Sequence, residues 1–324
     1  MIVNEIQSFL GRDWEAVQEG MRTALGTDIS LLDITNRNLL GHPGKQLRPL
    51  LSLLVARACG GRANADSVRY AVASELLHNA TLLHDDVADG SDLRRGEPTV
   101  RSFLGPNASV LIGDFWLVRA VRCVLEAERG KERVTSVMAG TLSDLAEGEM
   151  FQLQKASSCD TTLQDYLGII YRKTASLFVA TALAAAISVE ASPELEEACA
   201  AYGRYLGLAF QMRDDILDYL PSGDIGKPVG VDVMERKITL PLLCALDNVD
   251  ATTGADIRKK VRDITPSRRD GILEFARSNG GIDGAQKVLE EYSVMAVKAL
   301  EPLRPSQEKE WLEKLAVACS QRMK

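Results

Sequence analysis

The amino-acid sequence predicts an all-α protein with a single domain over residues 1–324. Apolar residues recur at spacings of three and four along most of the chain, which is the period of an amphipathic helix. The alternation of apolar and polar residues that marks a half-buried strand is absent. Breakers that contain Gly and Pro fall between the helical stretches, without a low-complexity linker or a short repeat. We therefore expect a bundle of helices packed around one core.

The expected helices follow one another along the whole chain. In the first half they are Ile2–Leu25, Leu47–Cys59, Ser67–Val87, Ala108–Glu126 and Val134–Gln154. In the second half they are Leu163–Val189, Pro193–Leu220, Leu240–Leu246, Gly271–Ser278, Ala285–Leu303 and Gln307–Cys319. The main breakers are residues 41–44, 60–61, 96–98, 105–106 and 221–230. The last of these is the most loop-like stretch of the sequence.

The composition argues against a nucleic-acid partner. The formal net charge is -7, and aromatic residues make up 5% of the chain, so few side chains are available to stack on bases. The hydrophobic share of 46% is enough to bury a large core. Cations must therefore be gathered locally if the protein binds an anion, and that anion is expected to be small.

Cysteine usage and hydropathy predict a cytoplasmic protein. The six cysteines are widely spread, form no C-x-x-C pair and read as free buried thiols of a reducing compartment. The N-terminus lacks the basic-then-apolar pattern of a signal peptide. The longest uncharged run, Thr174–Val189, is shorter than the ~20 residues that a membrane span needs. We expect no transmembrane segment.

Two aspartate clusters of the form D-D-x-x-D carry the chemistry. They are Asp85, Asp86 and Asp89 in one helix and Asp214, Asp215 and Asp218 in another. Residues four apart share a helix face, and like charges at that spacing cost a few tenths of a kcal/mol. Hard divalent cations such as Mg²⁺ offset this cost, since they bind carboxylate oxygens together with phosphates. A solvated helix end explains one such cluster about as well, but not two with basic residues beside both.

Polar and basic residues near the clusters predict sites for two diphosphates. His78 lies two turns before Asp85 on the same face, where a core histidine is the alternative reading. Arg94 and Arg95 follow the first cluster and can bind phosphate oxygens bidentately. The remaining candidates are Lys45 and Arg48, three apart and on one face if helical, and Lys173, Thr174, Gln211, Lys227 and Lys237. Together they describe a cavity with carboxylates on two walls and cations on the others.

With these motifs in view, the chain resembles the trans-polyprenyl diphosphate synthase family, the polyprenyl synthetases, across nearly its whole length. The matching segments are GKQLRP, ELLHNATLLHDDVADGSDLRRGEPT, ASVLIGDF, KTASLF, FQMRDDILD and GKPVGVDVMERKITLPLL. One departure is Arg236, because the family more often has Gly before the lysine that corresponds to Lys237. The resemblance implies an isoprenoid-synthase-type helical bundle around a central substrate cavity.

The resemblance also implies roles for the candidate residues. The metal ligands would be Asp85, Asp89, Asp214 and Asp218, and the catalytic set would be Asp85, Asp86, Asp89, Lys173, Asp214 and Asp215. Isopentenyl diphosphate would be held by Lys45, Arg48, His78 and Arg95. The allylic diphosphate would be held by Arg94, Lys173, Thr174, Gln211, Lys227 and Lys237. Mg²⁺ is the implied cofactor, with Mn²⁺ as a substitute, and a homodimer is the implied assembly.

The implied reaction is ionisation, condensation and elimination. Metal and cations neutralise charge on the departing diphosphate, the isopentenyl double bond attacks the allylic cation, and a proton is lost. Water would capture the cation, so Ser222–Gly230 is expected to act as a lid. The expected primer is farnesyl or geranylgeranyl diphosphate, and product release is expected to involve at most a transient membrane contact.

The expected length of the prenyl product follows from the helix before the first aspartate cluster. At ~1.5 Å per residue, Ala80 lies about 7 Å and Leu77 about 12 Å below Asp85, so these two residues and Thr81 should line the tunnel for the growing chain. Short-chain members of the family tend to place an aromatic residue there. Here the first aromatic back along the helix is Tyr70, roughly 22 Å down. The resulting expectation is a C30 to C50 product, with octaprenyl as the central value.

Three other functions share part of this pattern. A short-chain synthase making C15 or C20 products would share every motif and differ only in the tunnel. A terpene cyclase would share the fold and the first aspartate motif but would usually lack GKQLRP and the second D-D-x-x-D. A non-catalytic partner subunit would tend to have lost aspartates, and all six are present here.

Overall fold

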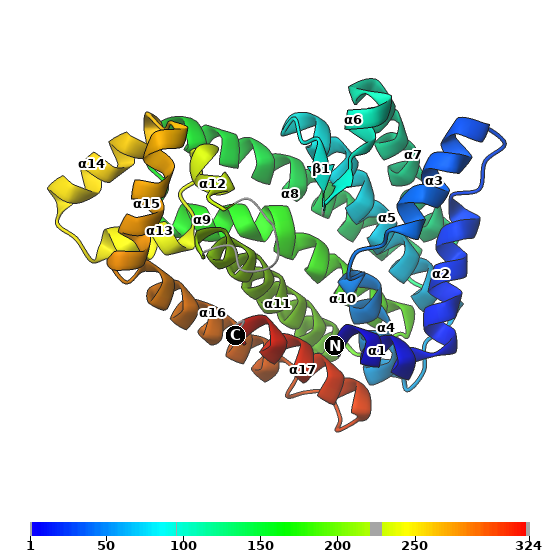
Figure 1. Ribbon diagram of the computed structural model, residues 1–324. Coiled ribbons are helices and arrows are strands. Elements are labelled where there is room, and N and C mark those ends of the chain that lie inside the picture. Colours follow the sequence, from blue (N-terminus) through cyan, green and yellow to red (C-terminus); the bar gives the residue numbers. More distant parts are fainter. Residues whose placement is uncertain (1, 95, 221–228, 322–324) are drawn as a thin grey trace. The chain divides into compact units, whose positions relative to one another are not determined.

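The computed structural model describes residues 2–94, 96–220 and 229–321 (Figure 1). The chain forms two compact units. Unit 1 contains Met1–Ala139, Ala180–Ala200 and Pro302–Leu312, and unit 2 contains Gly140–Val179, Ala201–Glu301 and Glu313–Lys324. Within the described residues almost all regular structure is helical, because the strands there are two residues long each. The predicted all-α class is confirmed, and the single domain over 1–324 stays a prediction.

Most elements lie entirely within one of the two units. Unit 1 contains α1 (Ile2–Leu10), α2 (Arg12–Ala24), α3 (Ser30–Gly41), α4 (Leu47–Gly60), α5 (Ala65–Ala88), β1 (Leu93–Arg94), β2 (Glu97–Pro98), α6 (Val100–Leu104) and α7 (Pro106–Leu125). Unit 2 contains α9 (Leu163–Ile170), the π-helical turn η1 (Tyr171–Ala175), α12 (Val231–Met234), α13 (Leu240–Asp247), α14 (Ala251–Arg262), α15 (Pro266–Ser278) and α16 (Gly281–Ala299). Four helices have residues in both: α8 (Lys131–Ser158), α10 (Ser176–Ser188), α11 (Pro193–Tyr219) and α17 (Gln307–Ser320).

The core of unit 1 is built around α5. This helix packs along α7 and also contacts α2 and α4 (Figure 1). Its buried residues lie on every face, as expected for a helix surrounded by neighbours. A capping box starts it: the Asn64 side chain accepts the Ser67 backbone N–H, and the Ser67 hydroxyl accepts that of Asn64. The Ser67 hydroxyl also contacts that of Ser188 at 2.7 Å, which ties the start of α5 to the end of α10.

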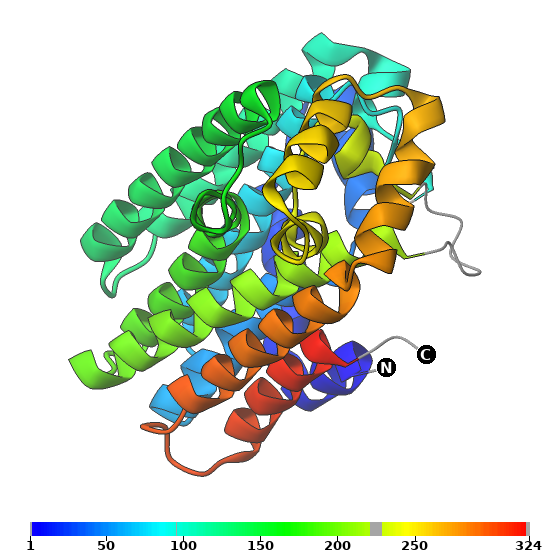
Figure 2. The same cartoon turned by 90° about the vertical axis from the view of Figure 1, so that its left-hand side faces the viewer.

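In unit 2, α13 is enclosed by α9, α15 and α16 (Figure 2). Pro241 stands at the start of α13, where its missing N–H costs nothing. Close approaches between helices use small residues. A Cβ on Gly207 of α11 would lie 2.6 Å from Ala175 Cα, and one on Gly203 would lie 2.7 Å from Phe178 O. These glycines let α11 approach η1 and α10 closely, and η1 carries two of the candidate site residues.

The structure differs from the expected helices at several points. The helix expected over Ile2–Leu25 is divided at Gly11, whose φ of +52° interrupts the helical backbone. The helix expected over Leu163–Val189 contains the π-helical turn η1. Among the described residues, four α-helices were not expected, namely α3, α6, α12 and α14, and neither were the short strands β1 and β2. Of these, α3 leaves Leu31 and Ile34 exposed, so its apolar pattern gave a weak signal.

One helical stretch among the described residues, Leu163–Ser188, is long and apolar enough to cross a membrane by length and composition. Of its most apolar window, 67% is buried inside the protein. Burial of this extent is what a helix in a protein core shows. The stretch includes Asp165, Arg172 and Lys173, which are costly at membrane depth.

Candidate functional site

The first aspartate cluster stands at the C-terminal end of α5. Asp86 is 4% exposed, Asp85 is half-buried, and Asp89 is exposed at the C-cap of the helix. The fold therefore separates the three carboxylates into one that points into unit 1 and two that are more open to solvent. Burial raises the pKa of Asp86, and the neighbouring guanidinium of Arg94 opposes that rise.

A short hairpin after α5 holds Arg94 beside this cluster. Strands β1 and β2 pair antiparallel, with Arg94 opposite Glu97. Arg94 Nε donates to Asp86 Oδ1 at 2.8 Å, and Thr99 donates its hydroxyl to the carbonyl of Ser91 at 2.8 Å. The hairpin thus fixes a guanidinium against the buried aspartate. Arg95, the next residue along the chain, lies outside the described residues.

The N-terminal cations are arranged differently from the helical expectation. Helix α4 begins at Leu47, so Lys45 lies before it and is exposed, while Arg48 is in its first turn and 8% exposed. Between them, Gln46 has a φ of +47°, a left-handed conformation that is uncommon for a residue other than Gly. Lys45 and Arg48 were expected on one face if both were helical, and because Lys45 lies before the helix they do not share a helix face. His78 is half-buried on α5.

The residues expected to line a product tunnel lie on α5 below the first cluster. Leu77 and Ala80 are buried, at 0% and 1% exposure, and Thr81 is half-buried. The Thr81 hydroxyl donates to the carbonyl of His78 at 2.7 Å, so it is satisfied within the helix. Tyr70, further down α5, donates its hydroxyl to the carbonyl of Arg129. The tunnel itself stays a prediction.

The second aspartate cluster stands at the C-terminal end of α11. Asp214 is exposed and Asp215 is 4% exposed. Asp215 accepts two hydrogen bonds, from the Tyr166 hydroxyl to Oδ2 at 2.6 Å and from Gln211 Nε2 to Oδ1 at 2.8 Å. Burial raises the pKa of Asp215 to about 6, against the lowering effect of these two donors.

The third aspartate of this cluster holds the following segment. Asp218 accepts the backbone N–H groups of Val231 and Asp232 at 3.1 and 3.0 Å, one on each carboxylate oxygen. Its own carbonyl accepts the N–H of Gly230 at 2.9 Å. A carboxylate at the start of α12 satisfies N–H groups that have no partner within the helix. Lys227 and most of the expected lid Ser222–Gly230 lie outside the described residues.

The π-helical turn η1 presents Lys173 and Thr174. Such turns insert an extra residue into a helix and are frequent at functional sites. Thr174 donates its hydroxyl to Gln211 Oε1 at 2.7 Å, which extends the hydrogen-bonded chain to Thr174, Gln211 and Asp215. Lys173 forms an ion pair with Glu149 of α8. The structure therefore brings together three predicted residues of unit 2 in one connected network.

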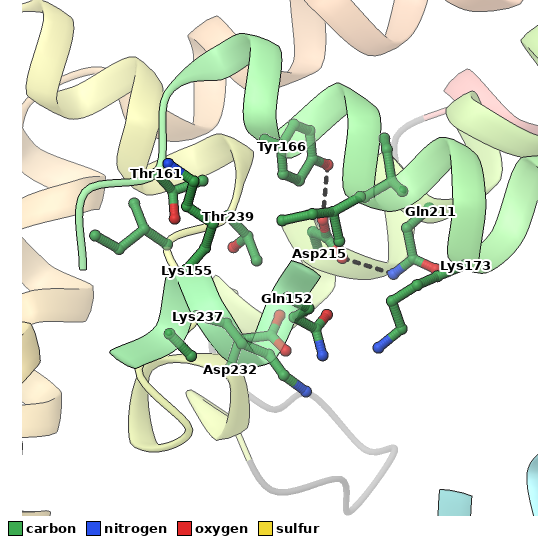
Figure 3. A pocket seen from close by; sticks show the side chains of 14 residues that line it. Gln152, Lys155, Thr161, Tyr166, Lys173, Gln211, Asp215, Asp232, Lys237 and Thr239 are labelled. Atoms are coloured by element: carbon green, nitrogen blue, oxygen red, sulfur yellow. Dashed lines mark hydrogen bonds between the residues drawn. The ribbon is translucent and has the colours of Figure 1, made fainter. Parts of the chain in front are cut away.

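A small pocket lies beside this network (Figure 3). It has a volume of about 130 Å³ and is lined by polar residues that include Lys155, Lys173, Gln211, Asp215, Asp232 and Lys237. In Figure 3, Gln152, Lys173 and Lys237 point to the same side of the pocket, below Asp215, while Lys155 turns towards Thr161. Lys237 pairs with Glu235, and burial together with the nearby carboxylates of Asp215 and Asp218 raises the pKa of Asp232 well above its usual value.

The described residues do not contain a preformed metal cluster, because no three His, Cys, Asp or Glu side chains among them are grouped closely enough to hold an ion. Mg²⁺ is commonly held by one or two carboxylates and completed by phosphate oxygens and water. The more open aspartates, Asp85, Asp89 and Asp214, are donors of the right kind for that arrangement.

Sequence reasoning missed Tyr166, Lys155 and Glu149. Tyr166 lies in an apolar helix with no pattern that would single out its hydroxyl. Lys155 forms ion pairs with Asp160 at 3.2 Å and Asp165 at 2.9 Å, and neither spacing is visible in the sequence as a motif. Glu149 could be recognised only from its position beside Lys173 across two helices.

Comparisons with known proteins agree on one family. The polyprenyl synthetase family profile matches residues 30–272. An octaprenyl diphosphate synthase from Haemophilus influenzae is 38% identical over 318 residues, which is 98% of this chain and 96% of that protein. An all-trans-nonaprenyl-diphosphate synthase (geranyl-diphosphate specific) from Rhodobacter capsulatus is 34% identical, covering 93% and 92%. A polyprenyl synthase from Caulobacter crescentus CB15, solved with calcium and isoprenyl diphosphate, superposes with a TM-score of 0.91 at 33% identity, covering 99% and 98%.

Proposed function

Because this chain belongs to the polyprenyl synthetase family, we propose that it joins isopentenyl diphosphate units to an allylic diphosphate and releases a long-chain all-trans polyprenyl diphosphate. The main support for this function is the sequence similarity to an octaprenyl and a nonaprenyl diphosphate synthase. Each similarity covers more than nine-tenths of this chain and of the relative. The enzyme is a prenyltransferase that proceeds by ionisation, condensation and elimination. We place its product at C30 to C50, with octaprenyl as the central value.

Mg²⁺ is the metal that the donor set suits, with Mn²⁺ as a substitute. The residues that would hold it are Asp85 and Asp89 of the first cluster and Asp214 and Asp218 of the second. Their oxygens are hard donors, and Asp218 keeps lone pairs although its two oxygens already accept backbone N–H groups. When bound, the metal would neutralise charge on the diphosphate that leaves the allylic carbon.

The chain's own cations complete the stabilisation of the diphosphates. We assign Lys45, Arg48, His78 and Arg95 to isopentenyl diphosphate, and Arg94, Lys173, Thr174, Gln211, Lys227 and Lys237 to the allylic diphosphate. Lys173 is held by Glu149, and Gln211 is oriented by Thr174, so neither side chain has to be ordered when substrate arrives. Preformed donors of this kind stabilise developing charge at little cost of reorganisation.

The buried aspartates have a supporting role in this proposal. Asp86 is bound to Arg94, and Asp215 is bound to Tyr166 and Gln211, so each fixes residues around the open aspartates. Tyr166 is a positioning residue in this proposal, because its hydroxyl donates to Asp215, which also accepts from Gln211. The expected primer is farnesyl or geranylgeranyl diphosphate, and a short-chain C15 or C20 synthase is the alternative that differs only in product length.

A homodimer is the assembly we infer. Three apolar residues of α7, Leu111, Val118 and Leu125, are 68%, 57% and 53% exposed and follow one another at intervals of seven. This spacing places them along one face of the helix, as in a seam between paired helices. A second copy of the chain would cover that face on both subunits by two-fold symmetry. Light scattering of Val118→Lys should then report a monomer where the natural chain reports a dimer.

The localisation that fits this function is the cytoplasm, with at most a transient membrane contact when the apolar product leaves. The function is tested by incubating the enzyme with Mg²⁺, labelled isopentenyl diphosphate and primers of C10, C15 and C20. The products are dephosphorylated and separated by chain length. The proposal predicts alcohols of C30 to C50, whereas products that stop at C20 would support the short-chain alternative. No incorporation with any primer would reject the activity.

A further inference from the structure

Two cysteines that are 140 residues apart in the sequence meet inside unit 1. The Sγ atoms of Cys59 and Cys199 lie 3.5 Å apart, close enough for a thiol–thiol hydrogen bond. Both are free thiols. A disulfide has an S–S bond of about 2.05 Å, so the two sulfurs would need to approach each other by about 1.5 Å. The pair is therefore near bonding distance while reduced.

The local packing explains why the two helices come so close. Cys59 lies in the last turn of α4, directly before Gly60 and Gly61. A Cβ on Gly60 would lie 2.6 Å from Val189 Cβ, so only glycine lets the end of α4 approach the segment that leads into α11. Cys199 follows in the second turn of α11, and its side chain is 0% exposed. Because helix ends open more readily than helix centres, the last turn of α4 can supply the small movement.

The two thiols differ in access and in reactivity. Cys59 is half-buried, so a small oxidant can reach it, whereas Cys199 is enclosed. The hydrogen bond with Cys199 lowers the pKa of Cys59, against burial, which raises it. The same bond raises the pKa of Cys199. The thiolate is the form that reacts with peroxides, so Cys59 is the thiol that reacts first.

We propose that Cys59 and Cys199 form a reversible redox pair that closes to an intrachain disulfide under peroxide. In the first step the Cys59 thiolate attacks one oxygen of hydrogen peroxide, the O–O bond breaks, and the products are Cys59 sulfenic acid and, after protonation, water. In the second step the Cys199 sulfur attacks the Cys59 sulfur, the S–O bond breaks, and the departing hydroxyl takes the Cys199 thiol proton and leaves as a second water. The balance is two thiols and one peroxide giving one disulfide and two waters. A dithiol reductant reverses it.

The bond would connect α4 to the helix that carries the second aspartate cluster, so it would restrain the unfolded chain across a long loop. Loops of this length give large stabilisation when they are closed. The expected physical effect is a rise in the melting temperature of the oxidised protein by at least about 5 °C. This effect does not depend on the proposed prenyl transfer.

The test uses the natural full-length chain. Reduced protein is treated with a small excess of hydrogen peroxide, the remaining thiols are blocked, and trypsin digestion is followed by mass spectrometry without reduction. Cleavage after Lys and Arg places Cys59 in residues 58–62 and Cys199 in residues 174–204, and neither peptide contains another cysteine. The expected result is these two peptides joined with the loss of two hydrogen atoms, and their release by dithiothreitol.

Matched variants separate the pair from general oxidation. Cys59→Ser and Cys199→Ser should each abolish the joined peptides and the rise in melting temperature. Cys123→Ser should change neither, because burial raises the pKa of Cys123 to about 11 and so keeps its thiol protonated. Peroxide-treated natural protein that carries sulfinic acid on Cys59 without the crosslink, or a crosslink to any other cysteine, would overturn the proposal.

Discussion

The two aspartate clusters have the same spacing, but their buried middle residues are held by different partners. Asp86 of unit 1 faces a cation, the guanidinium of Arg94, whereas Asp215 of unit 2 faces the neutral donors Tyr166 and Gln211. Burial raises the pKa of both, and only at Asp86 does an adjacent cation oppose that rise. A repeated motif therefore does not imply a repeated environment.

The third aspartates differ as well. Asp89 caps the end of α5 and is exposed, whereas Asp218 binds the backbone of Val231 and Asp232 at the start of α12. The second cluster is thereby connected to the segment that follows it in the sequence, and the first cluster is connected to the hairpin of β1 and β2 through Arg94. In each cluster the buried middle aspartate organises its surroundings, and the aspartates on either side of it are the ones we assign to the metal.

The largest effect is expected when an open aspartate is neutralised in either cluster. Asp85→Asn and Asp214→Asn should each lower kcat by roughly 10²–10³-fold, because each removes a carboxylate that would hold the metal ion against the departing diphosphate. Circular dichroism should be unchanged, since both side chains are partly or fully open to solvent. If only one of the two variants lost activity at saturating Mg²⁺, the clusters would not act together.

A second prediction concerns the two helices that lead to the clusters, because only α5 is expected to line the tunnel for the product. Ala80→Tyr places a ring about 7 Å below Asp85 and should shift products to C15 or C20, because a close-packed interior yields little to the growing chain. Leu77→Phe, one turn deeper, should stop growth at an intermediate length. Chromatography of the dephosphorylated alcohols measures both.

The matched control for this change is Ala209→Tyr. Ala209 lies five residues before Asp214, as Ala80 does before Asp85, and it is equally buried. The Ala209→Tyr variant should lower the stability of the fold by overpacking but leave the length of any product unchanged. If Ala80→Tyr made the parental length, Ala80 would not face the tunnel.

A third prediction concerns the cations of the two units. Arg48→Gln should weaken the apparent affinity for isopentenyl diphosphate by about 10- to 150-fold, because a charge-assisted hydrogen bond is worth roughly 1.5–3 kcal/mol. Lys237→Gln should have the same effect on the allylic diphosphate. Steady-state kinetics with each substrate varied in turn tests the division, and equal losses for both substrates in both variants would refute it.

The smallest effect is expected at the positioning residue Tyr166. Tyr166→Phe removes one neutral hydrogen bond to buried Asp215, so kcat should fall by about 2- to 12-fold while the KM for both substrates changes little. Tyr171→Phe is the matched control, because its ring lies over Arg204 and would stay there. A change in KM alone would show that Tyr166 acts on substrate binding instead.

The helical fold and the family could be predicted from the sequence because their signals are local. The apolar period predicts α5 and α11, and each D-D-x-x-D motif spans one helical turn. The break at Gly11 was missed because an isolated glycine inside an apolar pattern is often tolerated in a helix. Helix α3 was missed because its apolar residues Leu31 and Ile34 are left exposed.

The partners of the site residues could not be predicted in the same way. The bond between Tyr166 and Asp215 joins positions 49 apart, and the ion pair of Lys173 with Glu149 depends on how α8 packs. The left-handed Gln46 also removed the helical relation expected between Lys45 and Arg48. Such contacts are set by tertiary packing, which leaves no fixed spacing in the sequence.

Removal of metal tests the central claim most directly, because both clusters are assigned to a divalent ion on the diphosphate. Turnover of labelled isopentenyl diphosphate with farnesyl diphosphate should fall to background in EDTA. It should return when Mg²⁺ or Mn²⁺ is added in excess, with circular dichroism unchanged throughout. Undiminished turnover in the chelated enzyme would contradict the assignment of both aspartate clusters.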